Sequence, residues 1–92
     1  MTPTLIAKED LHNLHYATQE VLANPADRNH RKFVLDEALM LGNDFKQKVK
    51  IIFKADTGIY AVETTIWAVT DSHIELKAGK DMPISCILEV VI

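Results

Sequence analysis

The chain has 92 residues, a formal net charge of −3, a hydrophobic content of 48% and 25% charged residues. This length predicts a single domain over residues 1–92, and the composition is that of an ordinary globular protein that folds without metal or disulfide support. The slightly acidic balance argues against a protein that binds nucleic acid or a membrane surface strongly, although a local basic patch is compatible with it.

Three features bear on the compartment. The single cysteine, Cys86, cannot form an internal disulfide, so nothing points to an oxidising environment. The first ten residues, MTPTLIAKED, offer no signal-peptide core. No apolar run approaches the roughly 18 residues that a membrane span needs. We therefore expect a cytoplasmic protein with no membrane contact.

The N-terminal part of the chain has the periodicity of a helix. Between residues 7 and 23 the apolar positions recur with a spacing close to 3.6, which predicts an amphipathic helix. These positions are Leu11, Leu14, Val21 and Leu22. Asn24 precedes Pro25, and the residue before a proline is disfavoured in the helical region, so the helix is expected to end there.

A second helix is predicted over residues 28–41, with Asp27 as its N-cap and Gly42-Asn43 as its stop. Val34, Leu35 and Ala38 contribute to its apolar face. The charged residues fall mostly opposite and include Arg28, Arg31, Lys32, Asp36 and Glu37. Because the connection is only about three residues long, the two helices are expected to form an antiparallel hairpin over residues 7–42.

After Asp44 the period changes to two, which is typical of half-buried strands. In residues 45–54 the lysines fall on alternate positions and define one polar face. A turn at Asp56-Thr57-Gly58 leads into a long strand over 59–69, where the polar triplet Glu63-Thr64-Thr65 predicts a bend or bulge. Bent strands of this kind are what a small barrel needs in order to close.

Three shorter strands complete the pattern. They are expected at residues 73–77, 82–84 and 87–92, with a hairpin loop at 78–81 and a single 3₁₀ turn at Ser85-Cys86. The fold class predicted for the chain is α+β, with a two-helix hairpin followed by a five-stranded antiparallel barrel over residues 45–92.

The order of elements between Val62 and Val90 carries a resemblance. A bent strand, a short turn, HIEL, a glycine hairpin and MPISCILEV resemble the Sm-like and SH3-like small barrels. Helices placed before such a barrel look like a group of short, uncharacterised bacterial proteins, for which the resemblance implies a fold but no known activity. The Rho-binding antiterminator proteins are a related small-barrel type, and that likeness implies contact with a protein partner. The loops that resemble Sm-type RNA sites hold Thr70-Asp71-Ser72 and Ser85-Cys86 here, so RNA binding of the Sm kind is not implied.

A row of lysines is the main charge feature, and Tyr60 and Trp67 are the only candidate stacking residues beside it. The row consists of Lys46, Lys48, Lys50 and Lys54. It could follow a phosphate backbone, and such binding would weaken with salt. The alternative, which we favour, is that an edge strand carries lysines against aggregation.

Groups with catalytic or metal-binding chemistry are sparse. Glu9, His12 and His15 could lie on one helix face, but isolated histidines at this spacing are mostly surface residues, so no metal is expected. Cys86 has no nucleophile signature around it, and a buried cysteine acting as a small hydrophobe is favoured. No set of nucleophile, base and orienting group is found, so we expect neither an enzyme nor a cofactor.

Trp67 points away from the expected barrel interior, so it is either covered by the helical hairpin or left as a binding anchor, and we expect it to be covered. A fully buried indole would make Trp67→Ala cost roughly 3–5 kcal/mol of stability. The leading functional hypothesis is an interaction module, a monomer or weak dimer, that binds an unidentified protein partner at the barrel edge or at the seam between helices and barrel. The alternative is weak RNA binding through residues 46–54.

Overall fold

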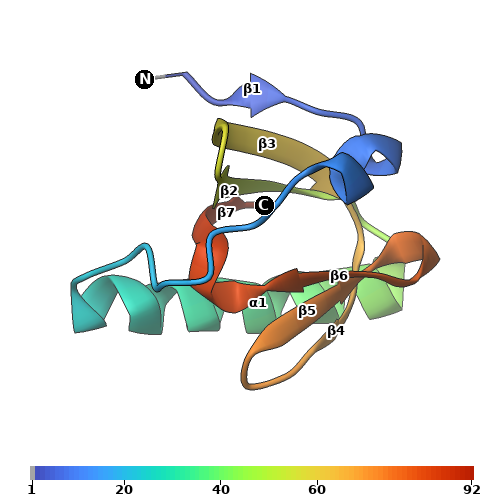
Figure 1. The fold of residues 1–92 in the computed structure, drawn as a ribbon. Helices are drawn as coiled ribbons and strands as arrows, with labels where there is room; N and C mark the ends of the chain where they lie inside the picture. The colour runs from blue at the N-terminus through green and yellow to red at the C-terminus, as the bar shows by residue number, and fades with distance from the viewer. Residues whose placement is uncertain (1) are drawn as a thin grey trace.

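A four-stranded sheet carries the longest strands of this α+β protein in the computed structural model, which describes residues 2–92 (Figure 1). The strand order is β1-β3-β2-β7, in which β1 runs parallel to β3 and the other neighbours are antiparallel. The strands are β1 (Thr4–Leu5), β2 (Val49–Ala55), β3 (Gly58–Thr64) and β7 (Ile87–Val91).

A second, antiparallel sheet has the order β4-β5-β6. Its strands are β4 (Ile66–Val69), β5 (His73–Leu76) and β6 (Lys80–Pro83). Three short 3₁₀ helices interrupt the chain, namely η1 (Lys8–Asn13), η2 (Lys77–Gly79) and η3 (Ile84–Cys86). One long helix, α1 (Pro25–Phe45), packs against β4 of one sheet and β7 of the other, and it runs along the bottom of the view in Figure 1.

The core lies between the two sheets and the helix. Along β2 the side chains of Val49, Ile51 and Phe53 are buried, whereas Lys50 and Lys54 are exposed, as strict alternation requires. The other core side chains come from every part of the chain and include Leu11, Leu35, Val62, Ile66, Ile74, Leu76, Met82, Cys86 and Ile87. No helix within residues 2–92 is both long and apolar enough to cross a membrane.

The prediction of a helix over residues 7–23 is wrong, and with it the two-helix hairpin. Only the short η1 forms. After it the chain is mostly extended and pairs with the C-terminal end of β2. Tyr16 forms a β-bridge with Ala55, and the amide of Ala17 donates to the carbonyl of Lys54 at 3.0 Å. Pairing with the sheet therefore satisfies backbone groups that a helix would otherwise have satisfied internally.

The boundaries of the remaining helix also differ from those predicted. Asn24 rather than Asp27 is the N-cap, because its side chain accepts from the amide of Ala26 at 2.9 Å, and Pro25 occupies the first turn, where proline is tolerated. The helix continues through Gly42 to Phe45, and Lys46 ends it in the left-handed conformation. Asn24-Pro25 thus starts a helix instead of stopping one.

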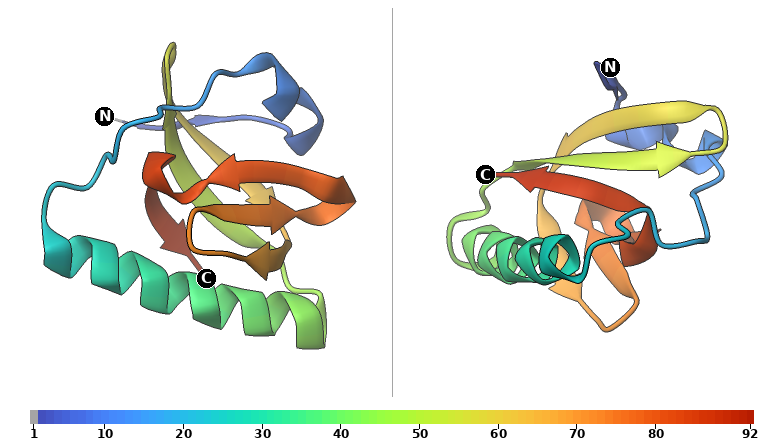
Figure 2. Two further views of the ribbon diagram at one scale, coloured as in Figure 1. Left: turned by 60° about the horizontal axis from the view of Figure 1, so that its bottom comes forward. Right: turned by 90° about the vertical axis from the view of Figure 1, so that its left-hand side faces the viewer.

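The predicted five-stranded barrel is wrong as well, because the strands form two separate sheets and no closed barrel (Figure 2). The long strand over 59–69 breaks at Thr65, so that β3 pairs with β2 whereas β4 pairs with β5. On the other side η3 separates β6 from β7, and these two strands also belong to different sheets. A closed barrel would require the two sheets to be hydrogen-bonded to each other where β3 passes into β4 and where β6 passes into β7.

Several local predictions within this region are confirmed. The polar triplet at residues 63–65 marks the change of direction between β3 and β4, and the last strand is β7. The single 3₁₀ turn before it is η3. The strand expected over residues 45–54 begins only at Val49, so Lys46 and Lys48 lie outside it.

Candidate functional site

The lysine row does not lie on a sheet edge. Strand β2 runs between β3 and β7, so the expectation that these lysines protect an exposed edge is wrong. On the outer face of β2, Lys50 stands opposite Glu63 of β3 and Ile52 stands opposite Glu89 of β7. Lysines and acidic residues are therefore mixed on this face, and it offers no continuous basic track.

Tyr60 is engaged in the structure. Its ring stacks on Phe53 with centroids 6.0 Å apart, and its hydroxyl lies 2.6 Å from Oγ1 of Thr57. Phe53 is also met edge-on by Tyr16 at 5.6 Å, so the three rings form one cluster. Tyr60 consequently contributes to the packing of β2 against β3 and has one ring face already occupied.

Trp67 is 45% exposed, so the prediction that the helices cover it is wrong. It lies in β4 at the border of a pocket of about 470 Å³, which we call the Trp67 pocket. This pocket is lined by Gly42, Asn43, Lys46, Lys48, Thr65, Trp67 and Lys77. Two of the four lysines singled out in the sequence thus line the same pocket as the indole, whereas Lys50, Lys54 and Tyr60 do not line it.

The close approach of α1 to β4 positions one side of the pocket. Gly42 lies so near this strand that a Cβ atom on it would be 2.4 Å from the carbonyl oxygen of Ile66. Just beyond, the amide of Lys46 donates to the carbonyl of Gly42 at 3.0 Å, which turns the chain back toward β2. Lys46 and Lys48 are therefore held on the α1 side.

The other side of the pocket comes from the second sheet. The amide of Lys77 donates to the carbonyl of Thr65 at 3.0 Å, and this bond ties the start of η2 to the break between β3 and β4. Lys77 is thereby brought into the lining of the pocket that also holds Trp67, two residues beyond Thr65. Sequence reasoning did not single out Lys77, because its approach depends on the pairing of β4 with β5.

The electrostatic character of the pocket is cationic. Three lysines line it, and among residues 2–92 no aspartate or glutamate does. Cations at the C-terminal end of a helix are favoured by about 0.3–1 kcal/mol, which is one reason for lysines next to α1. This effect does not account for Lys77, which lies on a different element. An exposed indole in a pocket lined by three lysines is suited to an anionic ligand with an aromatic or apolar part.

A partly buried ion pair lies toward the opposite end of α1, and sequence reasoning missed it. Arg31, whose side chain is only 6% exposed, donates from Nη1 to Oε2 of Glu20 at 2.8 Å and to the carbonyl of Ile87 at 2.9 Å. Nη2 of the same arginine lies 2.5 Å from Oε1 of Glu20. The hydrogen bond from Arg31 lowers the pKa of the Glu20 carboxyl to about 2. Arg31 was expected on the charged, solvent-facing side of the predicted helix. In the structure its side chain is buried instead.

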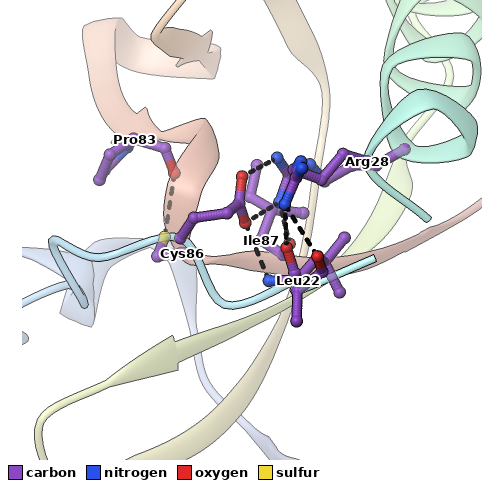
Figure 3. Close-up of polar contacts among 8 residues, drawn as sticks. Leu22, Arg28, Pro83, Cys86 and Ile87 are labelled. Atoms are coloured by element: carbon purple, nitrogen blue, oxygen red, sulfur yellow. Dashed lines mark hydrogen bonds and ion pairs between the residues drawn. The ribbon is translucent and has the colours of Figure 1, made fainter. Parts of the chain in front are cut away.

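Neighbouring contacts extend this polar cluster (Figure 3). Nη1 of Arg28 donates to the carbonyl of Leu22 at 2.8 Å, and the amide of Leu22 donates to Glu20 at 2.9 Å. These bonds hold the extended segment before α1 against the first turns of the helix and the start of β7. Both Nη atoms of Arg31 are bonded to groups of the chain itself, so we assign the cluster to the fold and not to ligand binding.

Cys86 is fully buried in η3, which confirms that it packs as a small hydrophobic side chain. Its thiol donates to the carbonyl of Pro83 at 3.0 Å, and burial raises the pKa of the thiol to about 12. We expect the native protein to react with a thiol reagent such as Ellman's reagent only as fast as it unfolds. The control is the same reaction in denaturant, where Cys86 is exposed. If the native protein were labelled as fast as the denatured protein, this expectation would be contradicted.

The two histidines considered as metal ligands do not share a helix. Nδ1 of His12 lies 2.7 Å from the carbonyl oxygen of Glu9, whereas His15 lies beyond η1 with Nδ1 3.4 Å from Oδ2 of Asp56. In the described part of the chain, no group of three His, Cys, Asp or Glu side chains is arranged to hold a metal ion. The face expected to present Glu9, His12 and His15 together therefore does not form.

The exposure of Trp67 changes the stability expected of its alanine variant. Because about half of the indole remains in water, Trp67→Ala is expected to lower the free energy of unfolding by about 1–2 kcal/mol, and not by the amount for a covered ring. Chemical denaturation followed by circular dichroism measures this difference. A loss as large as that of a fully buried tryptophan would mean that the indole is covered in solution.

Comparison of the chain with protein-family models, with curated proteins and with solved structures found no match.

Proposed function

We propose that this chain is a non-enzymatic, cytoplasmic binding module that takes an anionic partner at the Trp67 pocket. One observation carries the proposal. The single tryptophan of the chain is exposed at the seam between α1 and β4, in a pocket lined by Lys46, Lys48 and Lys77. Tryptophan and clustered cations are typical anchors of binding surfaces.

A catalytic function has less support. The one cysteine is buried and its pKa is raised to about 12, so it remains a protonated thiol near neutral pH. The pocket itself presents lysines, an asparagine, a threonine and the indole. These groups can neutralise and orient an anion, which is sufficient for binding.

The partner expected from the sequence was a protein bound at the barrel edge or at the seam between helices and barrel. The Trp67 pocket lies at such a seam, and its lysines require that a protein partner present an acidic segment. The second candidate is a nucleic acid. It is favoured because Lys46 and Lys48 line the same pocket as the exposed ring of Trp67, which together with Tyr60 was a stacking candidate beside the lysine row.

Because Trp67 is the only tryptophan, its fluorescence reports on the pocket directly. The protein should be titrated with a poly-glutamate peptide and with short single-stranded RNA at low and high salt. The matched variants are Lys46→Glu/Lys48→Glu, which reverses two charges in the pocket, and Lys50→Glu/Lys54→Glu, which reverses two on the outer face of β2.

We expect at least one polyanion to change the emission at low salt, with weakening at high salt. The change should be lost in Lys46→Glu/Lys48→Glu and retained in Lys50→Glu/Lys54→Glu. A protein that responds to neither polyanion, or that responds equally in both variants, would overturn the proposed site.

A further inference from the structure

We infer that the Trp67 pocket is a nucleotide site, in which one base stacks on the indole of Trp67 while its phosphate is bound by the surrounding lysines. This inference rests on the proposed function and specifies its ligand. The chemistry is that of an aromatic base joined to a phosphate, either as a free mononucleotide or as one residue of a single strand.

The apolar part of the pocket favours a flat ring. Trp67 is its one large apolar side chain, and the other lining residues are lysines, Gly42, Asn43 and the largely buried Thr65. An acidic protein segment would normally add leucine or phenylalanine anchors, which need an enclosed apolar floor. A base needs only one exposed aromatic face, since stacking is worth about 1–3 kcal/mol per base without further apolar contact.

The polar groups fit the remaining parts of a nucleotide. The lysines come from separate segments, with Lys46 and Lys48 after α1 and Lys77 at η2, so they approach the pocket from two sides. Ammonium groups bind phosphate as point charges. Asn43 contributes a carboxamide with both a donor and an acceptor, which is the pattern that pairs with the edge of a base.

The extent of the site limits the length of the ligand. A pocket of about 470 Å³ is within the range of small-ligand sites, roughly 300–1,000 Å³. The basic character does not continue along β2, where Lys50 stands opposite Glu63 and Ile52 stands opposite Glu89. A long phosphate backbone would therefore find no further track, and we expect recognition of a single nucleotide unit.

The test uses the whole chain and follows Trp67 emission during titration with adenosine monophosphate, ribose 5-phosphate, a hexanucleotide of adenosine and a glutamate hexapeptide. Ribose 5-phosphate carries the phosphate without the base, so it separates stacking from charge. We expect both adenosine ligands to quench the emission, with ribose 5-phosphate binding about 5- to 150-fold more weakly, the range that corresponds to one stacking interaction.

A second measurement uses a fluorescein-labelled hexanucleotide and anisotropy, so that it does not depend on the indole. Trp67→Leu should weaken binding by a similar factor, whereas Trp67→Phe should retain more of it because it keeps an aromatic face. The circular dichroism spectrum and the denaturation midpoint of each variant show whether it is folded.

The outcomes are distinguishable. Binding of adenosine monophosphate and the hexanucleotide with similar affinity supports a free mononucleotide as the natural ligand, and binding of the hexanucleotide alone supports a nucleic acid strand. Equal binding of ribose 5-phosphate and adenosine monophosphate overturns the inference, because charge alone would then explain it. Binding of the glutamate peptide without either adenosine ligand overturns the nucleotide but leaves the binding module standing. A response to none of the four ligands overturns both.

Discussion

Glu20→Ala is expected to lower the free energy of unfolding by about 2 kcal/mol, less than for a fully buried pair, because the Glu20 side chain is 32% exposed and solvent screens part of the interaction. The variant leaves the guanidinium of Arg31 buried, with its side chain 6% exposed and without a counter-ion. The carbonyl of Ile87 would remain as an acceptor for Nη1. Nε has no hydrogen-bond partner within residues 2–92 even in the native chain, so little local compensation is at hand.

Urea denaturation followed by far-ultraviolet circular dichroism measures the effect, and Arg31→Met provides the matched comparison. Replacing both members of a buried ion pair by apolar residues is often close to neutral, so Glu20→Ala/Arg31→Met should be more stable than Glu20→Ala alone. If Glu20→Ala stays within about 0.5 kcal/mol of the native chain, the pair contributes no more than an exposed salt bridge.

The same carboxyl gives the pair a pH dependence with a definite sign. Arg31 lowers the folded-state pKa of Glu20 from its usual 4.5 to about 2, so its contribution is fully present above the unfolded-state pKa. That contribution is lost as the pH falls from about 4.5 toward 2, and solvent around the partly exposed Glu20 carboxyl reduces its size. In Glu20→Gln the loss of stability over this window should be smaller than in the native chain. Equal pH profiles would show that other carboxyls account for the acid sensitivity.

The strands could be predicted from the sequence because their signal is local. Alternation along β2 and the polar triplet after Val62 fix which side chains face the core and where the long strand bends. The pairing of these strands is a long-range property. Whether β3 and β4 form one continuous barrel strand or belong to two sheets depends on hydrogen bonds from Lys77 to Thr65 and across β4 and β5, which alternation does not encode.

The segment before α1 shows how tertiary pairing overrides helical periodicity. Leu11 and Leu14 have the spacing of a helical face, but His15, Tyr16 and Thr18 have modest helix propensity. The free end of β2 offers backbone partners at Lys54 and Ala55, and Tyr16 gains an edge-to-face contact with Phe53. The apolar side chains can be buried from an extended chain as well as from a helix, so their spacing did not distinguish the two.

The candidate site was predicted only in part for the same reason. Lys46, Lys48 and Trp67 were visible as a charged run and an aromatic residue that was hard to place. Their meeting requires α1 to continue past Gly42 and the chain to reverse at Lys46. Lys77 carried no sequence signal, since its alternating position in the strand pattern indicated only that it points outward. Gly42 is the residue that allows α1 to approach β4 closely. The sequence pattern indicated only a helix stop at this glycine, so its role in the contact was not predicted.

Gly42→Ala is expected to destabilise the protein by about 2 kcal/mol, although alanine is the better helix former by about 1 kcal/mol. The new methyl group would lie 2.4 Å from the carbonyl oxygen of Ile66 and 3.0 Å from Cγ2 of Thr65. The first of these neighbours is backbone within the β4 pairing, so it cannot rotate away. Relief requires the end of α1 to move off the sheet, and this loses packing.

Asn29→Ala is the matched control, because Asn29 is exposed within the same helix and gains propensity without a clash. It should leave stability unchanged or raise it by a few tenths of a kcal/mol. Movement of the α1 end would also displace Lys46 and Asn43 from Trp67, so Gly42→Ala should change the tryptophan emission and weaken ligand binding at the pocket, whereas Asn29→Ala should do neither. A Gly42→Ala protein that is as stable as Asn29→Ala, with unaltered emission, would show that the helix end does not depend on this contact. The expected pair of results would instead tie the stability of the fold and the shape of the pocket to the same missing side chain.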